Sequence, residues 1–356
     1  MKTSAKVVIQ HVKNGPLEFV QVDLPLPGPH QVLVKMIATG VCQSQIYWMH
    51  QERQAPMLFG HEGYGMAAAV GSKVRDVAEG DCVLVTWVPR RADDGRSAEV
   101  ATLELPNGVV ARSPNVYTWA DYCLADGLYV KPIRGGTHDP LMSIIGCAVI
   151  TGAGAVLNAA ATQKGESVAV FGTGGVGLAA VVAARVAGAK RIVAVDVDDS
   201  KLALARRFGA TDCINSRQDD PAGVIMRLGS LRCGCLPGVD VAIDCVAIPE
   251  VTLQALASLR PGRLGAERGG RCAVVGIPKM PVSIDTADLM RKQKSMVGVL
   301  GGSAPQQQID DFIDWYRDGI LDLAALVTDR FRFDDIPAAA DALERGRIAG
   351  RAIALT

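Results

Sequence analysis

The chain has 356 residues, more than one ordinary domain core at roughly 150 residues per domain, which predicts two domains. Hydrophobic residues make up 49% and charged residues 21%, a balance that excludes a disordered chain. Lys and Arg together number 37, as do Asp and Glu, and no long run of like charge occurs. We therefore expect a small-molecule partner rather than nucleic acid or a membrane.

The N-terminus and the cysteines indicate where the protein works. The first residues, MKTSAKVVIQHVKNG, lack the apolar stretch of a signal peptide, which favours a cytoplasmic protein. Nine irregularly spaced cysteines do not resemble the disulfide framework of a small secreted domain. We expect reduced thiols or metal ligands. Cys233 and Cys235 lie far from other Cys or His residues, so we expect them to be ordinary loop thiols.

The first 130 residues are predicted to be largely β-structure. Short apolar stretches such as VLVKMIATG, GYGMAAAVGSKV and DCVLVTWV are broken by Gly, Pro, Asn and Asp. The segment EVATLELPNGVVARS alternates around Asn107-Gly108, which predicts a hairpin with a two-residue turn.

From Ser167 onward, strands alternate with amphipathic helices. The pattern runs through SVAVFG, LAAVVAARVAG, RIVAVDV, KLALARRFGA, VDVAIDCV and CAVVGI. Apolar strands separated by helices predict an α/β fold with a doubly wound parallel sheet. A tail follows, with QQIDDFIDWYRDG and IPAAADALERG at helical period and RAIALT as a strand. We predict that residues 1–148 and 301–356 form one domain, into which residues 149–300 are inserted.

The segment Gly172-Thr173-Gly174-Gly175-Val176-Gly177 is a candidate dinucleotide loop. It follows an apolar strand and opens a helix, where glycines permit a tight turn, a close approach to a pyrophosphate and close helix packing. Asp196 ends the next strand, where a carboxylate accepts hydrogen bonds from the adenosine ribose. Asp196, Asp198 and Asp199 would repel a 2′-phosphate, which favours NAD over NADP. Lys201 is a further candidate for ribose contact.

Three residues of the β-rich half have the chemistry of a zinc site. Cys42 lies in ATGVCQSQIY, His61 in GHEG, and Cys147 in IIGCAVITGAG. Two thiolates and an imidazole suit zinc, and three protein ligands leave the fourth position open for a substrate oxygen. Their wide separation in the sequence does not establish the site by itself.

Several motifs together resemble one family. GVCQSQ matches G-V-C-H/R-S/T-D, GHEGYG matches G-H-E-x-x-G, GCAVITGAG matches G-C-x-x-x-T-G, and VFGTGGVG is followed by AVDVDDSK. In this order the chain resembles the zinc-dependent alcohol dehydrogenases of the medium-chain dehydrogenase/reductase superfamily. The resemblance implies a Rossmann domain inserted in a GroES-like catalytic domain. It also implies a homodimer or homotetramer, and reversible hydride transfer between an alcohol, held as a zinc alkoxide, and NAD, with aldehyde or ketone as product.

The resemblance carries roles residue by residue. It implies that Cys42, His61 and Cys147 bind the catalytic zinc, that Glu62 is a transient ligand behind it, and that Ser44 bonds the alcohol oxygen. Two tryptophans are implied to line the substrate pocket, Trp48 and Trp87. The implied cofactor-binding residues are Gly172, Gly174, Gly175, Val176, Gly177, Asp196, Lys201, Thr151 and Arg351.

The chain also departs from the family pattern. Many relatives carry four cysteines for a structural zinc between the positions of Val88 and Asn115, and this sequence has none there, so we predict one zinc per chain. Gln45 replaces an Asp that supports the zinc-bound imidazole, and it brings no charge, which predicts more weakly held zinc. Tyr47 replaces the proton-relaying His, with His50 as an alternative relay. Tyr47 is equally well explained as a pocket-lining aromatic.

Two other functions fit the same motifs. One is an NAD(P)H-dependent reductase of carbonyls or activated alkenes, in which the changes at Gln45 and Tyr47 reflect another proton path. The other is a non-catalytic nucleotide-binding protein. The retained zinc ligands and Ser44 argue against this second alternative.

Overall fold

The computed structural model describes residues 2–135, 139–230, 236–303 and 306–356. The predicted loop thiols Cys233 and Cys235 lie outside these ranges. The chain divides into two compact units. Unit 1 comprises Met1–Cys147, Pro305–Asp318 and Leu323–Thr356, and unit 2 comprises Ala148–Ala304 and Gly319–Asp322.

Unit 1 is built from two β-sheets. The strands of one run in the order β2-β1-β4-β8-β7, and those of the other in the order β10-β6-β5-β3-β18-β17, with β9 also paired to β3. β3 is buried along most of its length because strands cover both of its edges. The strands are β1 (Thr3–Gln10), β2 (Glu18–Leu24), β3 (Gln31–Val41), β4 (Met57–Leu58), β5 (Glu62–Val70), β6 (Cys82–Thr86), β7 (Thr102–Glu104), β8 (Val110–Arg112), β9 (Tyr122–Asp126), β10 (Val130–Pro132), β17 (Val327–Arg332) and β18 (Arg351–Leu355).

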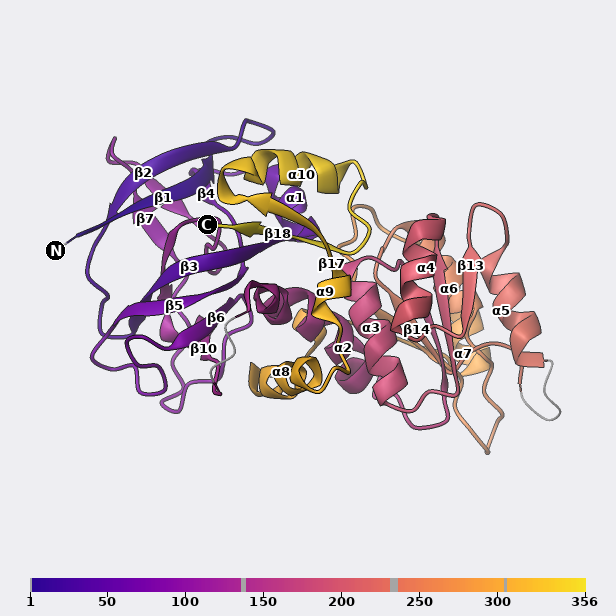
Figure 1. The fold of residues 1–356 in the computed structure, drawn as a ribbon. Coiled ribbons are helices and arrows are strands. Elements are labelled where there is room, and N and C mark those ends of the chain that lie inside the picture. The colour runs from indigo at the N-terminus through magenta and orange to yellow at the C-terminus, as the bar shows by residue number, and fades with distance from the viewer. Residues whose placement is uncertain (1, 136–138, 231–235, 304–305) are drawn as a thin grey trace. The chain divides into compact units, whose positions relative to one another are not determined.

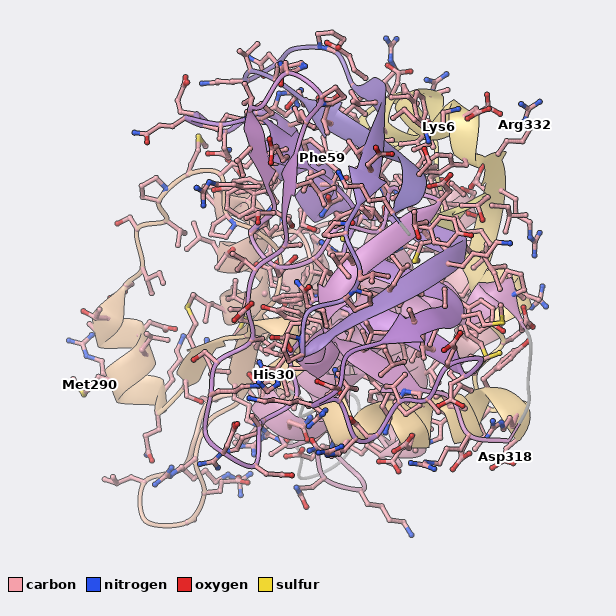
Figure 2. The ribbon with its side chains drawn as sticks, turned by 90° about the vertical axis from the view of Figure 1, so that its left-hand side faces the viewer. Lys6, His30, Phe59, Met290, Asp318 and Arg332 are labelled. Atoms are coloured by element: carbon pink, nitrogen blue, oxygen red, sulfur yellow. The ribbon has the colours of Figure 1, made fainter. Side chains whose placement is uncertain are left out.

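The C-terminal tail completes unit 1. β18 pairs antiparallel with β3, and Figure 1 shows the yellow β18 beside the indigo β3. β17 joins the same sheet by pairing with β18, and Figure 2 shows its last residue, Arg332, close to Lys6. Nζ of Lys6 and Oδ1 of Asp334 form an ion pair at 2.6 Å, which ties the segment after β17 to β1. The helices of unit 1 are α1 (Gln43–Met49), α8 (Ile309–Arg317), α9 (Leu323–Leu326) and α10 (Ile336–Glu344).

The predicted hairpin is present as β7 and β8, but its turn is longer than expected. The Leu105 N–H donates to the Val109 carbonyl, and the Gly108 N–H donates to the Leu105 carbonyl. Only Gly108 of the predicted Asn-Gly pair has a left-handed backbone, at φ +79°. A type I′ two-residue turn needs two left-handed residues, whereas one left-handed glycine closes a three-residue turn. Pro106 has a fixed negative φ, which suits the start of the longer turn.

Unit 2 contains the predicted doubly wound sheet. Its six parallel strands lie in the order β13-β12-β11-β14-β15-β16. β12 and β13 extend the sheet on one side of β11, and the chain then crosses to the other side to add β14, β15 and β16. β13 and β16 were not predicted from the sequence. The strands are β11 (Ser167–Phe171), β12 (Arg191–Asp196), β13 (Asp212–Asn215), β14 (Val241–Asp244), β15 (Arg271–Val274) and β16 (Ser295–Gly298), and the helices are α2 (Ile150–Gly154), α3 (Gly175–Val186), α4 (Asp199–Phe208), α5 (Pro221–Ser230), α6 (Pro249–Ala257) and α7 (Thr286–Lys292).

One helical stretch is long and apolar enough to cross a membrane. It covers Pro140–Ala159, and 78% of it is buried inside the structure. Core helices of globular proteins have the same length and composition, so this stretch is weak support for a membrane span.

Candidate metal centre

Cys42 lies where β3 passes into α1. Its extended backbone (φ −109°, ψ 143°) forms the N-cap of α1, so its side chain leaves the sheet at the helix start. Gly40, two residues earlier, lies against Glu62, and a Cβ at Gly40 would be 2.4 Å from the Glu62 carboxyl carbon. Trp119 fixes this strand end by donating from its indole to the Gly40 carbonyl at 3.1 Å. Glycine is therefore required for Glu62 to occupy its place.

His61 follows a turn that only glycine can form. Gly60 has φ +86°, and a Cβ there would lie 2.4 Å from the backbone nitrogen of Trp119. The turn leads directly into β5, which begins at Glu62. His61 and Glu62 are therefore both fixed at the start of a buried strand.

Cys147 lies in a π-helical turn, Ile145–Val149. The Thr86 hydroxyl, at the end of β6, donates to the Gly146 carbonyl at 2.5 Å. This bond anchors the turn to the sheet that also carries His61. π turns are rare in proteins, and those that occur often lie at functional sites.

The structure brings these residues together. The ligand atoms of Cys42, His61, Glu62 and Cys147 all lie within 4.8 Å of one another, and all four residues are buried. The two sulfurs are 3.8 Å apart, and Nε2 of His61 is 3.1 Å from the Cys147 sulfur. A tetrahedral zinc with bonds of about 2.3 Å to sulfur holds two sulfurs about 3.8 Å apart, so the thiol pair fits zinc. Among the described residues, no second group of three such side chains is found.

The two thiols differ in acidity. A hydrogen bond from the Cys147 thiol lowers the pKa of Cys42. The positive charges of Arg351 and His61 act in the same direction, and together these effects outweigh burial, which acts to raise the pKa. The pKa of Cys147 is raised well above its usual value because it is the donor in that bond and is buried. The metal-free centre therefore favours one thiolate, the form that binds metal.

Glu62 and Arg351 form a buried ion pair behind the thiols. Burial raises the pKa of Glu62 to about 7, against the lowering effect of the Arg351 charge. Within the described residues, Oε2 of Glu62 has no hydrogen-bond partner, so one carboxylate oxygen remains available to a metal. A second contact of Arg351 is the Cys147 sulfur, 3.6 Å from its Nη2. The predicted contact of Arg351 with the cofactor pyrophosphate stays a prediction.

Gln45 contacts the metal-binding imidazole from the far side. Its Oε1 accepts the Gly60 N–H at 2.7 Å, so its Nε2 faces Nδ1 of His61 at 2.5 Å. In this orientation the Gln45 amide group donates to Nδ1. A neutral imidazole that accepts at Nδ1 carries its proton on Nε2, the nitrogen that faces the thiols. Gln45 thus favours the tautomer with a proton on Nε2, and a metal bound at Nε2 would have to replace that proton.

Ser44 lies beside two of the ligand atoms. Its hydroxyl lies 3.2 Å from the Cys42 sulfur and 3.4 Å from Nε2 of His61. Trp87 lies beside the same imidazole, with 6.0 Å between ring centroids. The predicted substrate contacts of Ser44 and Trp87 stay predictions.

The two relay candidates have different surroundings. The Tyr47 ring packs edge-on against Trp48, with centroids 5.4 Å apart. His50 lies at the surface, where Nδ1 meets Oδ1 of Asn14 at 2.6 Å and Nε2 meets Oε1 of Glu344 at 2.8 Å. His50 is therefore engaged at both ring nitrogens.

The glycine loop of unit 2 has the geometry of a phosphate-binding turn. Gly172 has φ +83°, and a Cβ at Gly177 would lie 1.9 Å from the Gly172 carbonyl oxygen, so both positions require glycine. Gly174 caps α3, and a Cβ there would meet open space, so its glycine leaves room for a ligand. Gly175 and Val176 form the first turn of α3.

Asp196, the predicted ribose-binding residue, accepts two hydrogen bonds from Thr173 that were not predicted. Thr173 donates to Oδ2 of Asp196 from its backbone at 2.7 Å and from its hydroxyl at 3.1 Å. The sequence did offer a sign of this contact, because Thr173 lies between the first two glycines and Asp196 ends the neighbouring strand. Lys201 lies in the first turns of α4, and the buried Thr151 hydroxyl in α2 has no partner within the described residues.

Comparisons with known proteins agree with this geometry. Residues 28–134 match the model for the alcohol dehydrogenase GroES-like domain, and residues 175–318 match that for zinc-binding dehydrogenases. An S-(hydroxymethyl)glutathione dehydrogenase of Synechocystis sp. is 31% identical, covering 98% of both chains, and one of Escherichia coli O1:K1 is 32% identical over the same shares. Two solved structures are similar over almost their whole lengths. An alcohol dehydrogenase zinc-binding domain protein from Burkholderia ambifaria has a TM-score of 0.87 at 28% identity, covering 100% of this chain and 99% of that one. The benzyl alcohol dehydrogenase from Acinetobacter calcoaceticus has a TM-score of 0.85 at 26% identity, covering 99% of each chain.

Proposed function

The chain belongs to the zinc-dependent alcohol dehydrogenases of the medium-chain dehydrogenase/reductase superfamily. On this premise we propose that it transfers hydride from an alcohol to NAD and that each chain holds one zinc. The observation that carries this proposal is the buried group of Cys42, His61, Glu62 and Cys147, whose two sulfurs have the spacing of zinc ligands. Zinc held there would supply Lewis-acid chemistry, which makes an alcohol hydroxyl acidic near neutral pH.

The protein side chains have separate tasks in this reaction. Cys42, His61 and Cys147 would hold the metal, and two thiolates would bring its net charge near zero. Ser44 is placed to bond the alcohol hydroxyl, because its own hydroxyl lies within 3.4 Å of both Cys42 and His61 ligand atoms. It receives the alcohol proton while passing its own onward, so the alcohol loses one proton and one hydride and becomes a carbonyl compound.

The acidic end of β12 supports NAD rather than NADP. Asp196, Asp198 and Asp199 follow one another closely at the position of the adenosine ribose. Within the described part of the chain, none of the three forms a salt bridge, so no paired cation offsets their charge. A 2′-phosphate would meet net negative charge there, since the three carboxylates outnumber Lys201, whose charge acts on Asp198.

The segment between Val88 and Asn115 supports a single zinc. It contains no cysteine. Instead, Arg96 bonds both carboxylate oxygens of Asp126, at 2.6 and 2.9 Å. A charged hydrogen-bonded pair can hold this loop without a metal.

The free thiols support a cytoplasmic protein. The seven cysteines that the structure describes form no disulfide. Thiols persist in reducing compartments, and a thiolate centre needs them reduced.

The surroundings of His61 support an aromatic or apolar alcohol as substrate. Trp87 lies beside the imidazole, and Tyr47 and Trp48 are the aromatic residues of α1. Flat aromatic walls pack well against flat apolar substrates. The relative from Acinetobacter is a benzyl alcohol dehydrogenase, whereas the curated relatives are named for S-(hydroxymethyl)glutathione.

An exposed edge of unit 2 supports a homodimer. Within the described residues, β16 pairs only with β15. Met296 and Val297, which point to opposite faces of the sheet, are 37% and 38% exposed. Leu300 is 80% exposed, and Figure 2 shows Met290 pointing outward from α7. An open apolar strand edge pairs readily with another strand, and a second copy offers the same edge in antiparallel direction.

A substrate panel tests this function. The full chain, loaded with zinc, is assayed on aromatic, primary and secondary alcohols, on formaldehyde with glutathione, and on carbonyls and enones, each with NAD(H) and NADP(H). We expect the highest kcat/KM for an aromatic alcohol with NAD. Cys147→Ala should be inactive, whereas Cys213→Ala, a thiol in β13, should match the parent. Activity confined to enone reduction, or a preference for NADP, would contradict the proposal.

A further inference from the structure

The carboxylate of Asp196 is held by hydrogen bonds alone. Oδ2 accepts the backbone N–H of Thr173 at 2.7 Å and its hydroxyl at 3.1 Å. Oδ1 accepts the N–H groups of Val197 at 2.8 Å and Asp198 at 3.2 Å. Within the described residues, no cation pairs with this carboxylate. Its orientation therefore depends on these four donors.

Only one of these donors is a side chain. Three are backbone N–H groups, which no substitution other than proline removes. The fourth is the Thr173 hydroxyl, and Thr173 is 0% exposed. Because Thr is β-branched and buried, its side chain has few accessible rotamers, and its hydroxyl is held in place. Thr173 thus connects two elements, the glycine loop and the end of β12.

We propose that Thr173 is a positioning residue for cofactor recognition, holding the Asp196 carboxylate in the orientation that receives the adenosine ribose. This inference rests on the proposed use of NAD. The hydroxyl acts through Asp196, and it couples the loop that would hold the pyrophosphate to the acid that distinguishes ribose from ribose phosphate. A carboxylate held by the three backbone donors alone would be less firmly oriented, and it would bond the ribose less well and repel a 2′-phosphate less.

Thr173→Val is the informative substitution, because it removes the hydroxyl and keeps the branched shape. The bond lost is a hydrogen bond to a charged group, so NAD binding should weaken about tenfold. NADP binding should be unchanged or stronger, so the preference for NAD falls. Thr173→Ser keeps the hydroxyl and should retain most of the preference. General damage to the loop would instead weaken both cofactors equally.

The test measures dissociation constants of NAD⁺ and NADP⁺ by calorimetric titration of the full chain, for the parent, Thr173→Val, Thr173→Ser and Asp196→Asn. The double variant Thr173→Val/Asp196→Asn completes a double-mutant cycle. We expect Thr173→Val to have little further effect once Asp196 is replaced. Equal weakening of NAD and NADP, an unchanged ratio, or the same loss in the Asp196→Asn background would overturn the inference. A parent protein that prefers NADP would instead contradict the proposed function.

Discussion

Gln45 shows how a single uncharged residue sets the state of the metal centre. It is buried, and its amide is oriented by the Gly60 N–H, which needs an acceptor. The NH₂ group then faces Nδ1 of His61. A metal on Nε2 needs a ring proton on Nδ1, and a carboxylate accepts that proton where this amide does not. Zinc on Nε2 would therefore work against a hydrogen bond from the Gln45 amide to Nδ1.

Gln45→Glu should bind zinc more tightly. Glu has the same length, so one oxygen can accept from Gly60 and the other from Nδ1 of His61. We expect an affinity about tenfold higher, measured by competition with a chromophoric chelator, since outer contacts of this kind change metal affinity by about 10-fold to 100-fold. Gln45→Met, which can bond neither group, should bind zinc more weakly. An affinity of Gln45→Glu equal to or below the parent's would show that the amide does not oppose the metal.

Tyr47→Phe should slow alcohol oxidation below neutral pH, whereas His50→Ala should have little effect. His50 is engaged by Asn14 and Glu344, so its ring is not free to carry a proton from the centre. Proton transfer by a positioned side chain contributes about 100-fold or more to the rate, so loss of the relay should reduce kcat by about 100-fold. The kcat profile from pH 5 to 10 separates the two residues. A profile altered only in His50→Ala would assign the relay to His50.

At the scale of elements, a buried carboxylate, Asp126, binds Arg96 of the loop after β6. The Arg96 guanidinium bonds both oxygens of Asp126, whose side chain is 1% exposed. The N–H groups of Glu99 and Leu128 also donate to this carboxylate. Burial acts to raise the pKa of Asp126, but the Arg96 and backbone hydrogen bonds lower it below its usual value.

Asp126→Asn should destabilise the metal-free protein by about 2 kcal/mol at pH 7, because it leaves Arg96 unpaired. The pKa of Asp126 is lower in the folded state, so its contribution is present above about pH 4, the unfolded value, and is lost as the pH falls through the folded pKa. Urea unfolding from pH 7 to 3 should therefore show the two proteins converging at low pH. Asp76→Asn, at a half-exposed pair with Arg90, should lose under about 1 kcal/mol. A difference that persists at pH 3 would assign the effect to packing.

The sequence predicted those elements whose signal is local. Gly172 and Gly177 marked the cofactor loop because a turn and a close approach need glycine wherever they occur. The π turn at Cys147 and the Arg96–Asp126 pair were not predictable, because both depend on which segments meet in three dimensions. The turn at Gly108 was predicted one residue too short, since Asn107-Gly108 fits two turn types and Pro106 decided between them.

For the whole molecule, the proposed homodimer depends on the open edge of unit 2. The Ser295 N–H donates to the carbonyl of Gly270, the residue before β15, and the Val299 N–H donates to the carbonyl of Val274, the last residue of β15. Because successive N–H groups of a strand alternate in direction, those of Met296 and Gly298 point to the open side. A partner strand would bond to these groups.

Met296→Pro should convert the dimer to a monomer without loss of the fold. Proline removes the outward N–H of Met296, which the strand's own sheet does not use. Met296→Thr keeps that N–H and should remain dimeric. Light scattering coupled to size-exclusion chromatography measures the mass. A dimeric Met296→Pro protein would place the interface elsewhere.

The central claim is that the Cys42, His61 and Cys147 centre holds the zinc that oxidation of an alcohol requires. The most direct measurement is the NAD-dependent alcohol oxidation rate of metal-stripped protein titrated with zinc, with bound metal counted by mass spectrometry. We predict no activity in the stripped protein and full activity at one zinc per chain. Full activity without zinc, or activity that appears only at two zinc ions per chain, would contradict the account.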